Sequence, residues 1–263
     1  VFMNLPIYQV DAFTDKIFRG NPACVIPLQN WIEDEKLLKI SQENSVPETA
    51  FFVKTLDGFH LRWFTPEIEM DLCGHATLAA AYVIKNYLKY DNNDINFKTL
   101  SGNLKVNFDE NIYTLDFPSR KPIETELPDT IKDVFSIKPI KTLKSRDYVL
   151  VYKSESEIKN ITLKQNLLNK IDIGTGGIIV TSKGNKSDFV SRYFTPNSSI
   201  IEDPVTGSAH CSLIPYWSEV LNKKKMIAIQ LSKRRGELIC EDKNERVLIG
   251  GKAKIYFKGR IWI

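Results

Sequence analysis

Two stretches of this sequence place residues capable of chemistry at the start of a helix. The first, "CGHAT", sets Gly74 and His75 before a small-residue run, and the second, "TGSAH", sets Gly207 and Ser208 in the same way. The first N–H groups of a helix have no partner within the helix, and they carry the positive end of its dipole. Each stretch is therefore suited to bind an anion such as a carboxylate.

The two stretches belong to an internal repeat. Arg-aromatic-Phe-Thr-Pro occurs at 62–66 and again at 192–196, an offset of 130, and Gly-polar-Ala at 74–76 returns at 207–209, an offset of 133. The second copy therefore carries three extra residues. A solenoid needs a period of about 20–50 residues, so this spacing instead predicts two similar half-molecules facing one another. We expect a carboxylate-bearing small molecule to bind between the two helix starts.

Four polar residues near these helix starts could act on such a ligand. His75 and Ser208 hold matching positions and can each donate a hydrogen bond to a substrate oxygen, although helix capping would also explain either one alone. Asp203 is the candidate for a group facing the ligand, or else it only complements the helix dipole. Glu48 precedes the apolar strand "TAFFV" (49–53) and is the candidate for proton transfer, because enzymes use carboxyl groups in such settings as general acids and bases.

Cys73 admits three interpretations: a catalytic thiol, a metal ligand or part of a turn. A two-thiol racemase needs a cysteine in each copy, but the second copy has none before its glycine, and Cys211 lies one helical turn beyond it. A zinc site of Cys73, His75, His210 and Cys211 fits no common spacing, because adjacent residues point about 100° apart on a helix. We therefore interpret Cys73 as part of a turn and predict no metal site.

The elements that must position these residues are mostly strands, with a few helices between them. Pro215 stands inside the second helix and predicts a kink near 211–215 or a later helix start. Three prolines and many charges make 118–129 resemble a linker. The expected strands are 6–13, 23–28, 49–53, 59–64, 95–99, 102–108, 112–117, 139–144, 147–152 and 249–263, and the expected helices are 33–44, 76–89, 129–136, 155–169 and the segment from Gly207.

The composition is that of a globular protein, with 43% hydrophobic and 26% charged residues. The net charge of +4 is dispersed and the basic runs are short, so we expect no nucleic-acid partner. No apolar run approaches the ~18 residues of a membrane span. Four scattered cysteines without a CxxC pair predict free thiols and a cytoplasmic protein.

The segments "VDAFTDKIFRGNPACVI", "SVPETAFF", "RWFTPEIEMDLCGHATLAAA", "IIEDPVTGSAHCSL" and "KGRIWI" resemble, in order and spacing, the PhzF family of phenazine-biosynthesis isomerase-like proteins. The resemblance implies an α+β, diaminopimelate-epimerase-like fold of two pseudo-symmetric halves, each a β-barrel-like sheet around a central helix. The halves would comprise 1–118 with the C-terminal strand 253–263, and 119–252. A homodimer, an active site between the halves and the absence of metal and organic cofactors are also implied.

By the same resemblance, Glu48 is the catalytic residue of a cofactor-independent isomerase that moves a proton on a small carboxylic acid. The residues that it assigns to substrate binding are His75, Asp203, Ser208, Gly74 and Gly207. Two alternatives stay open, since a fold does not fix a function. One is a thiol-dependent amino-acid racemase or epimerase using Cys73, and the other is a non-catalytic small-molecule-binding protein of the same fold.

Overall fold

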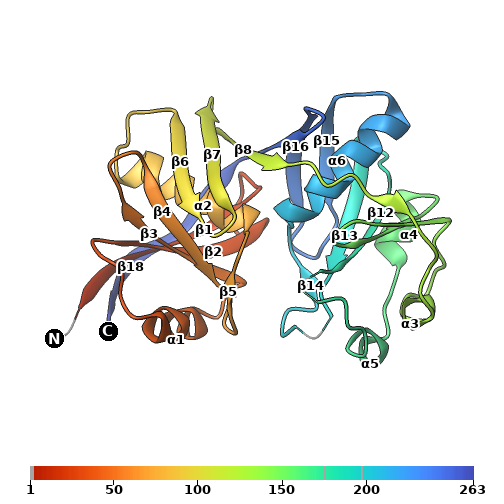
Figure 1. Ribbon diagram of the computed structural model, residues 1–263, viewed down its shortest axis with the longest axis horizontal. Coiled ribbons are helices and arrows are strands. Elements are labelled where there is room, and N and C mark those ends of the chain that lie inside the picture. The colour runs from red at the N-terminus through yellow and green to blue at the C-terminus, as the bar shows by residue number, and fades with distance from the viewer. Residues whose placement is uncertain (1–2, 175, 197) are drawn as a thin grey trace. The chain divides into compact units, whose positions relative to one another are not determined.

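The computed structural model describes residues 3–174, 176–196 and 198–263. The chain forms two compact units (Figure 1), the first comprising Val1–Phe117 with Ile249–Ile263 and the second comprising Pro118–Leu248. Among the described residues, none of the helices is long and apolar enough to cross a membrane.

The first unit encloses one helix, α2, in strands (Figure 1). Helix α2 contacts β1, β2 and β3, and it is buried on most of its surface, which marks a core helix rather than an amphipathic one. Its alanine-rich sequence lets the strands approach closely. Strand β18 returns the C-terminus to this unit by pairing antiparallel with β1. The elements are β1 (Asn4–Ala12), β2 (Asn21–Leu28), α1 (Asp34–Asn44), β3 (Glu48–Lys54), β4 (Phe59–Phe64), β5 (Glu69–Met70), α2 (Gly74–Tyr87), β6 (Asp94–Thr99), β7 (Gly102–Asp109), β8 (Ile112–Pro118) and β18 (Ala253–Trp262).

The second unit is built in the same way around α6, which is likewise buried along most of its length. Its core also contains the short helices that follow β9 and β11. The elements are β9 (Ile123–Glu124), α3 (Asp129–Lys132), β10 (Lys141–Lys144), β11 (Tyr148–Val151), α4 (Glu155–Asn160), α5 (Gln165–Leu168), β12 (Ile178–Lys183), β13 (Phe189–Phe194), β14 (Glu202–Asp203), α6 (Gly207–Leu221), β15 (Lys225–Gln230), β16 (Gly236–Asp242) and β17 (Arg246–Gly251). The last part of β17, from Ile249, belongs to the first unit.

The strand pairing of the second unit repeats that of the first. The antiparallel pairs β1–β2, β3–β4, β4–β5 and β6–β7 correspond to β10–β11, β12–β13, β13–β14 and β15–β16. The parallel pairs β2–β3 and β4–β6 correspond to β11–β12 and β13–β15. The internal repeat predicted from the sequence is therefore confirmed as a repeated strand topology.

Each copy contains a bidentate ion pair between the two strands that precede its central helix. Arg62 Nε and Nη2 donate to the carboxylate of Glu69 at 2.7 and 2.6 Å. Arg192 Nε and Nη2 donate to Glu202 at 2.7 and 2.9 Å. Each pair links neighbouring antiparallel strands (β4 to β5, and β13 to β14) with the geometry that makes an arginine–carboxylate contact strong. The ion pairs fix the loops that lead into α2 and α6.

Helix α6 begins at Gly207 and is continuous through Pro215, so a later start is wrong. A proline inside a helix leaves the carbonyl four residues earlier without its usual donor. Here that carbonyl belongs to Cys211, and it accepts a hydrogen bond from the backbone N–H of Arg120 at 2.9 Å. The segment after β8 thus replaces the missing helical hydrogen bond.

Three boundary predictions for the second unit need correction. The stretch 118–129 is not only a linker, because it contains β9, which pairs antiparallel with β10. The helix expected at 129–136 is the single turn α3. The helix expected at 155–169 is divided into α4 and α5, because the backbone is extended at Ile161, whose side chain is buried in the core.

Candidate active site

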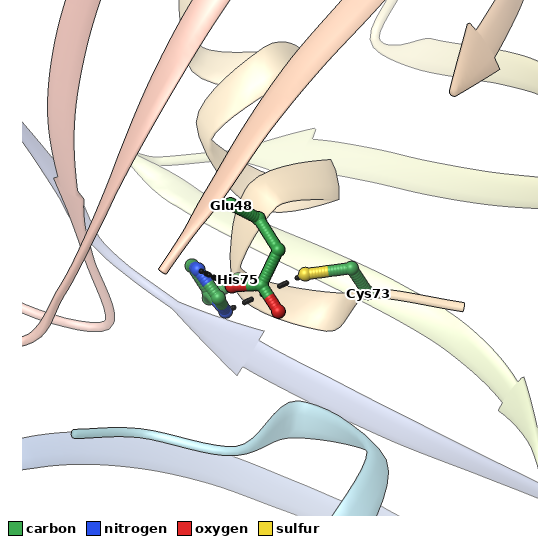
Figure 2. Close-up of side chains that lie close together, drawn as sticks. All are labelled: Glu48, Cys73 and His75. Atoms are coloured by element: carbon green, nitrogen blue, oxygen red, sulfur yellow. Dashed lines mark hydrogen bonds and ion pairs between the residues drawn. The ribbon is translucent and has the colours of Figure 1, made fainter. Parts of the chain in front are cut away.

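Three functional side chains of the first unit meet where β3 and α2 begin (Figure 2). Glu48 is the first residue of β3, Cys73 is the N-cap of α2, and His75 is the second residue of that helix. Glu48 Oε2 lies 3.1 Å from His75 Nε2, and Cys73 Sγ lies 3.6 Å from His75 Nδ1. The two residues predicted from separate motifs are therefore brought together as one site.

The start of α2 is fixed by local hydrogen bonds. Cys73 has extended backbone angles (φ −139°, ψ 111°), so the chain turns into the helix at Gly74. The Cys73 carbonyl accepts from the backbone N–H of Thr77 at 3.2 Å and also from the Thr77 hydroxyl. The interpretation of Cys73 as part of a turn is therefore incomplete, because its side chain also contacts His75.

Asn21 was not predicted as a site residue, yet it contacts the same ring nitrogen of His75 as Cys73 does. Its side chain is fully buried at the start of β2, and its Nδ2 lies 3.0 Å from His75 Nδ1. Parallel pairing of β2 with β3 brings it beside Glu48. The preceding Gly20 has φ +64°, and a Cβ there would lie 2.1 Å from the Ala12 carbonyl oxygen, so the turn requires glycine. In the sequence, the signal for Asn21 is an amide side chain directly after a glycine and at the start of a strand. In the structure, that strand runs parallel to the one that starts at Glu48.

The electrostatics of the cluster favour a charged ring beside a neutral thiol. Burial opposes charge on His75, but Cys73 and Glu48 outweigh it and hold the pKa of His75 well above its ordinary value of 6.5. Burial, assisted by the charge of Glu48, raises the pKa of the Cys73 thiol to about 11. Because a thiolate is the reactive form of cysteine, this thiol is a poor base at neutral pH. The arrangement is an imidazolium–carboxylate pair with 16% of the Glu48 side chain exposed.

The second unit offers a different set of groups at its helix start. Ser208 is the second residue of α6, the position that matches His75, and Thr206 stands at the N-cap in place of Cys73. Asp203 ends β14, and its carboxylate accepts a hydrogen bond from the Thr206 hydroxyl. Buried Gln230 donates to the Asp203 carbonyl and accepts from the Thr206 N–H, both at 2.8 Å. Gln230 was not predicted, and it fixes the backbone that leads into Gly207.

The position of Glu48 has no acidic counterpart in the second unit. The registers of β3 with β4 and of β12 with β13 align Glu48 with Gly177. A Cβ at Gly177 would lie 2.3 Å from the Tyr193 ring, so any larger side chain is excluded unless the ring moves. Thr206 likewise replaces the thiol of Cys73. The two copies are therefore alike in backbone and unlike in chemistry, with a carboxylate at one of these two matching positions.

His210 and Cys211, which had been weighed as metal ligands, are core residues of α6. His210 Nδ1 lies 2.9 Å from the Thr206 carbonyl oxygen, and burial lowers the pKa of His210 to about 4. Burial raises the pKa of Cys211 to about 12. Within the described part of the chain, the three potential metal donors that lie together are instead Glu48, Cys73 and His75.

Comparison with known proteins adds to this geometry. An uncharacterized isomerase of Pseudomonas aeruginosa is 43% identical over 259 residues, which cover 98% of this chain and 99% of the relative. The crystal structure of a PhzF-family phenazine biosynthesis protein from Enterococcus faecalis has a TM-score of 0.95 and 44% identity, covering 99% of this chain and 100% of that one. A hydroxyproline epimerase from Agrobacterium vitis shares the fold alone, with a TM-score of 0.65 and 7% identity over 99% of this chain and 93% of that one.

These likenesses confirm the predicted α+β, diaminopimelate-epimerase-like fold, which is the fold of PhzF proteins and related epimerases. The sequence profile of the family described as phenazine biosynthesis-like protein, PhzC-PhzF, matches residues 10–259. With a match of that length and relatives above 40% identity, the chain belongs to the PhzC-PhzF family.

Proposed function

We propose that this protein is a cofactor-independent isomerase in which Glu48 transfers a proton on a small carboxylic-acid substrate. The observation that carries the proposal is the Glu48–His75 pair. A partly exposed carboxylate lies 3.1 Å from a buried ring whose pKa is raised, so one group is open to a ligand and the other is fixed behind it. The naming of relatives as isomerases supports the same class of reaction.

The proposed reaction needs no electron acceptor. Glu48 takes a proton from a substrate carbon, and the electron pair of the broken C–H bond shifts into the neighbouring unsaturated system. The same carboxyl then returns the proton to another carbon of that system, so the product has the mass of the substrate. His75 holds the carboxylate in place and stabilises its charge, the positioned electrostatic role that active-site hydrogen-bond donors serve.

Substrate binding is assigned to His75, Asp203 and Ser208 and to the backbone N–H groups at Gly74 and Gly207. The N–H groups at each helix start suit a substrate carboxylate. Asp203 and Ser208 supply an acceptor and a hydroxyl near the second of these starts. The binding of one substrate by both helix starts, and the homodimer, stay predictions.

The thiol-dependent alternative has less support. The pKa of Cys73 is about 11, and the matching residue in the second copy is Thr206, so neither a thiolate nor a second thiol is provided. The non-catalytic alternative predicts saturable ligand binding without exchange of any substrate proton.

The proposal is tested by incubating the protein in D₂O with a panel of small carboxylic acids, amino acids and a dihydro-hydroxyanthranilate. Proton NMR and mass spectrometry would follow each compound. The proposal predicts an isomer that carries solvent deuterium and forms without any added cofactor. Conversion that requires an added nicotinamide, pyridoxal or metal would contradict it.

A further inference from the structure

The thiol of Cys73 has no part in the proposed proton transfer, yet it lies in the same cluster as Glu48 and His75. One oxygen, one sulfur and one nitrogen atom from these residues lie within 4.8 Å of one another. Cys73 and His75 are 5% and 3% exposed. Glu48 Oε2 and His75 Nε2 are buried 3.1 Å from each other. Neither atom has a hydrogen-bond partner among the residues that the structure describes. The cluster therefore combines three potential metal-ligand atoms from three residues, and Cys73 is one of them.

The spacing of the sulfur and nitrogen atoms matches that of two ligands on one metal ion. Zn²⁺ binds cysteine sulfur at about 2.3 Å and histidine nitrogen at about 2.1 Å, and a tetrahedral angle then places these atoms about 3.6 Å apart. Cys73 Sγ and His75 Nδ1 are 3.6 Å apart. Glu48 Oε2 lies 3.1 Å from the other ring nitrogen, Nε2, so its carboxylate must turn from Nε2 towards the ion to become the third donor. Three protein ligands plus water form a common zinc coordination.

We propose that Glu48, Cys73 and His75 bind one Zn²⁺ ion per chain, and that the bound ion blocks the site. On binding, the S–H bond of Cys73 and the N–H bond at Nδ1 of the imidazolium break, the two protons pass to the buffer, and the sulfur and nitrogen lone pairs bind the ion. No electron is transferred. The ion takes the place of Asn21 as the partner of Nδ1, and it occupies the carboxylate that would receive the substrate proton.

The blocking effect rests on the proposed function, whereas the binding of the ion does not. Glu48 is the most exposed of the three side chains and marks the side from which an ion reaches the sulfur and nitrogen. Zinc suits this set because it accepts sulfur, nitrogen and oxygen ligands together, and Co²⁺ is a spectroscopic substitute with the same ligand preferences.

The test is a titration of chelator-treated protein with Co²⁺ alone and then with Zn²⁺ alone. Bound Co²⁺ should give a thiolate-to-cobalt charge-transfer absorption in the near ultraviolet, saturating at one ion per chain. Zn²⁺ should then displace the cobalt and abolish the band. Cys24→Ala is the matched control, since Cys24 is another buried free thiol of the same unit and lies outside the cluster.

The control should keep the band, and Cys73→Ala should lose it. Glu48→Gln should keep the band but bind at least about 10- to 100-fold more weakly, since even outer partners of a metal site contribute that much. A band that is absent from wild type, or that survives in Cys73→Ala, overturns the zinc site and leaves the isomerase proposal standing. Zinc that binds with the expected stoichiometry but leaves proton exchange on the substrate unchanged overturns the blocking effect and counts against Glu48 as the acid–base group.

Discussion

Replacing Glu48 by glutamine tests the charged pair, because glutamine keeps the shape of the side chain and removes its charge. At the observed Nε2–Oε2 distance of 3.1 Å, two opposite unit charges attract by about 5 kcal/mol at an effective dielectric constant of about 20. Removal of one partner from a buried pair typically costs about 3–5 kcal/mol. Water screens part of this attraction because the Glu48 side chain is 16% exposed. We therefore expect Glu48→Gln to lower the free energy of unfolding by about 2–4 kcal/mol.

The loss should depend on pH in a defined direction. The pKa of His75 is raised in the folded protein, so the pair stabilises fully below the ordinary value of 6.5, and this contribution is lost as the pH rises through the folded pKa. In Glu48→Gln, the pKa of the ring moves downward, because Cys73 alone then opposes the effect of burial. The difference in stability between the two proteins should be larger at pH 6.5 than in alkaline solution, and should shrink as the pH rises through the folded pKa of His75.

Urea unfolding followed by tryptophan fluorescence across this pH range measures the difference directly. His60 and His210 are present in both proteins, so their titrations cancel in the comparison. The chain has three histidines, so the ring-nitrogen NMR signals of each can be told apart. The chemical shifts of the His75 ring nitrogens then report its protonation independently. A stability difference below about 0.5 kcal/mol, or one that stays constant with pH, would refute the charged pair.

Asn21→Ala should lower turnover by about tenfold, because loss of a buried side-chain contact worth about 1.4 kcal/mol frees the His75 ring. Steady-state kinetics and an altered His75 ring-nitrogen spectrum would show it, and an unchanged spectrum would exclude a positioning role. Gly177→Ala should lower the free energy of unfolding in urea by about 1–3 kcal/mol, because its Cβ would meet the Tyr193 ring. Gly259→Ala, which has open space around it, should change this free energy by less than about 0.5 kcal/mol, and equal effects of the two substitutions would contradict the packing. Cys73→Ala should keep turnover within about tenfold of wild type and insensitive to iodoacetamide, since a neutral thiol is no base; loss of turnover would favour thiol catalysis.

The repeat and the elements around it could be predicted from the sequence because local signals and tertiary structure agree there. Alternating apolar residues mark several of the strands, and each central helix begins at a glycine. The matching motifs at 62–66 and 192–196 also mark the strands that carry the arginine–carboxylate pairs. The family resemblance then predicted the fold. It also predicted that Glu48 and the first helix start belong to one active site.

The remaining features depend on contacts between residues far apart in the sequence. The hydrogen bond from Arg120 that makes α6 continuous through Pro215 joins segments about ninety residues apart, and no local pattern reports it. Asn21 lies between a glycine and a proline, a sequence typical of turns, and its contact with His75 depends on the parallel pairing of β2 and β3. Cys73 satisfied the criteria for a turn residue, and only the position of the ring shows its thiol to be part of the cluster.

Glu48 is proposed to carry the transferred proton. The most direct measurement compares wild type and Glu48→Gln, both saturated with the same substrate, for the rate at which solvent deuterium enters that substrate. Calorimetry would first establish that both proteins bind it. We expect the exchange rate to fall by about 10²–10⁴ with binding retained, the usual contribution of a positioned acid–base group. Exchange at the wild-type rate in Glu48→Gln would contradict it.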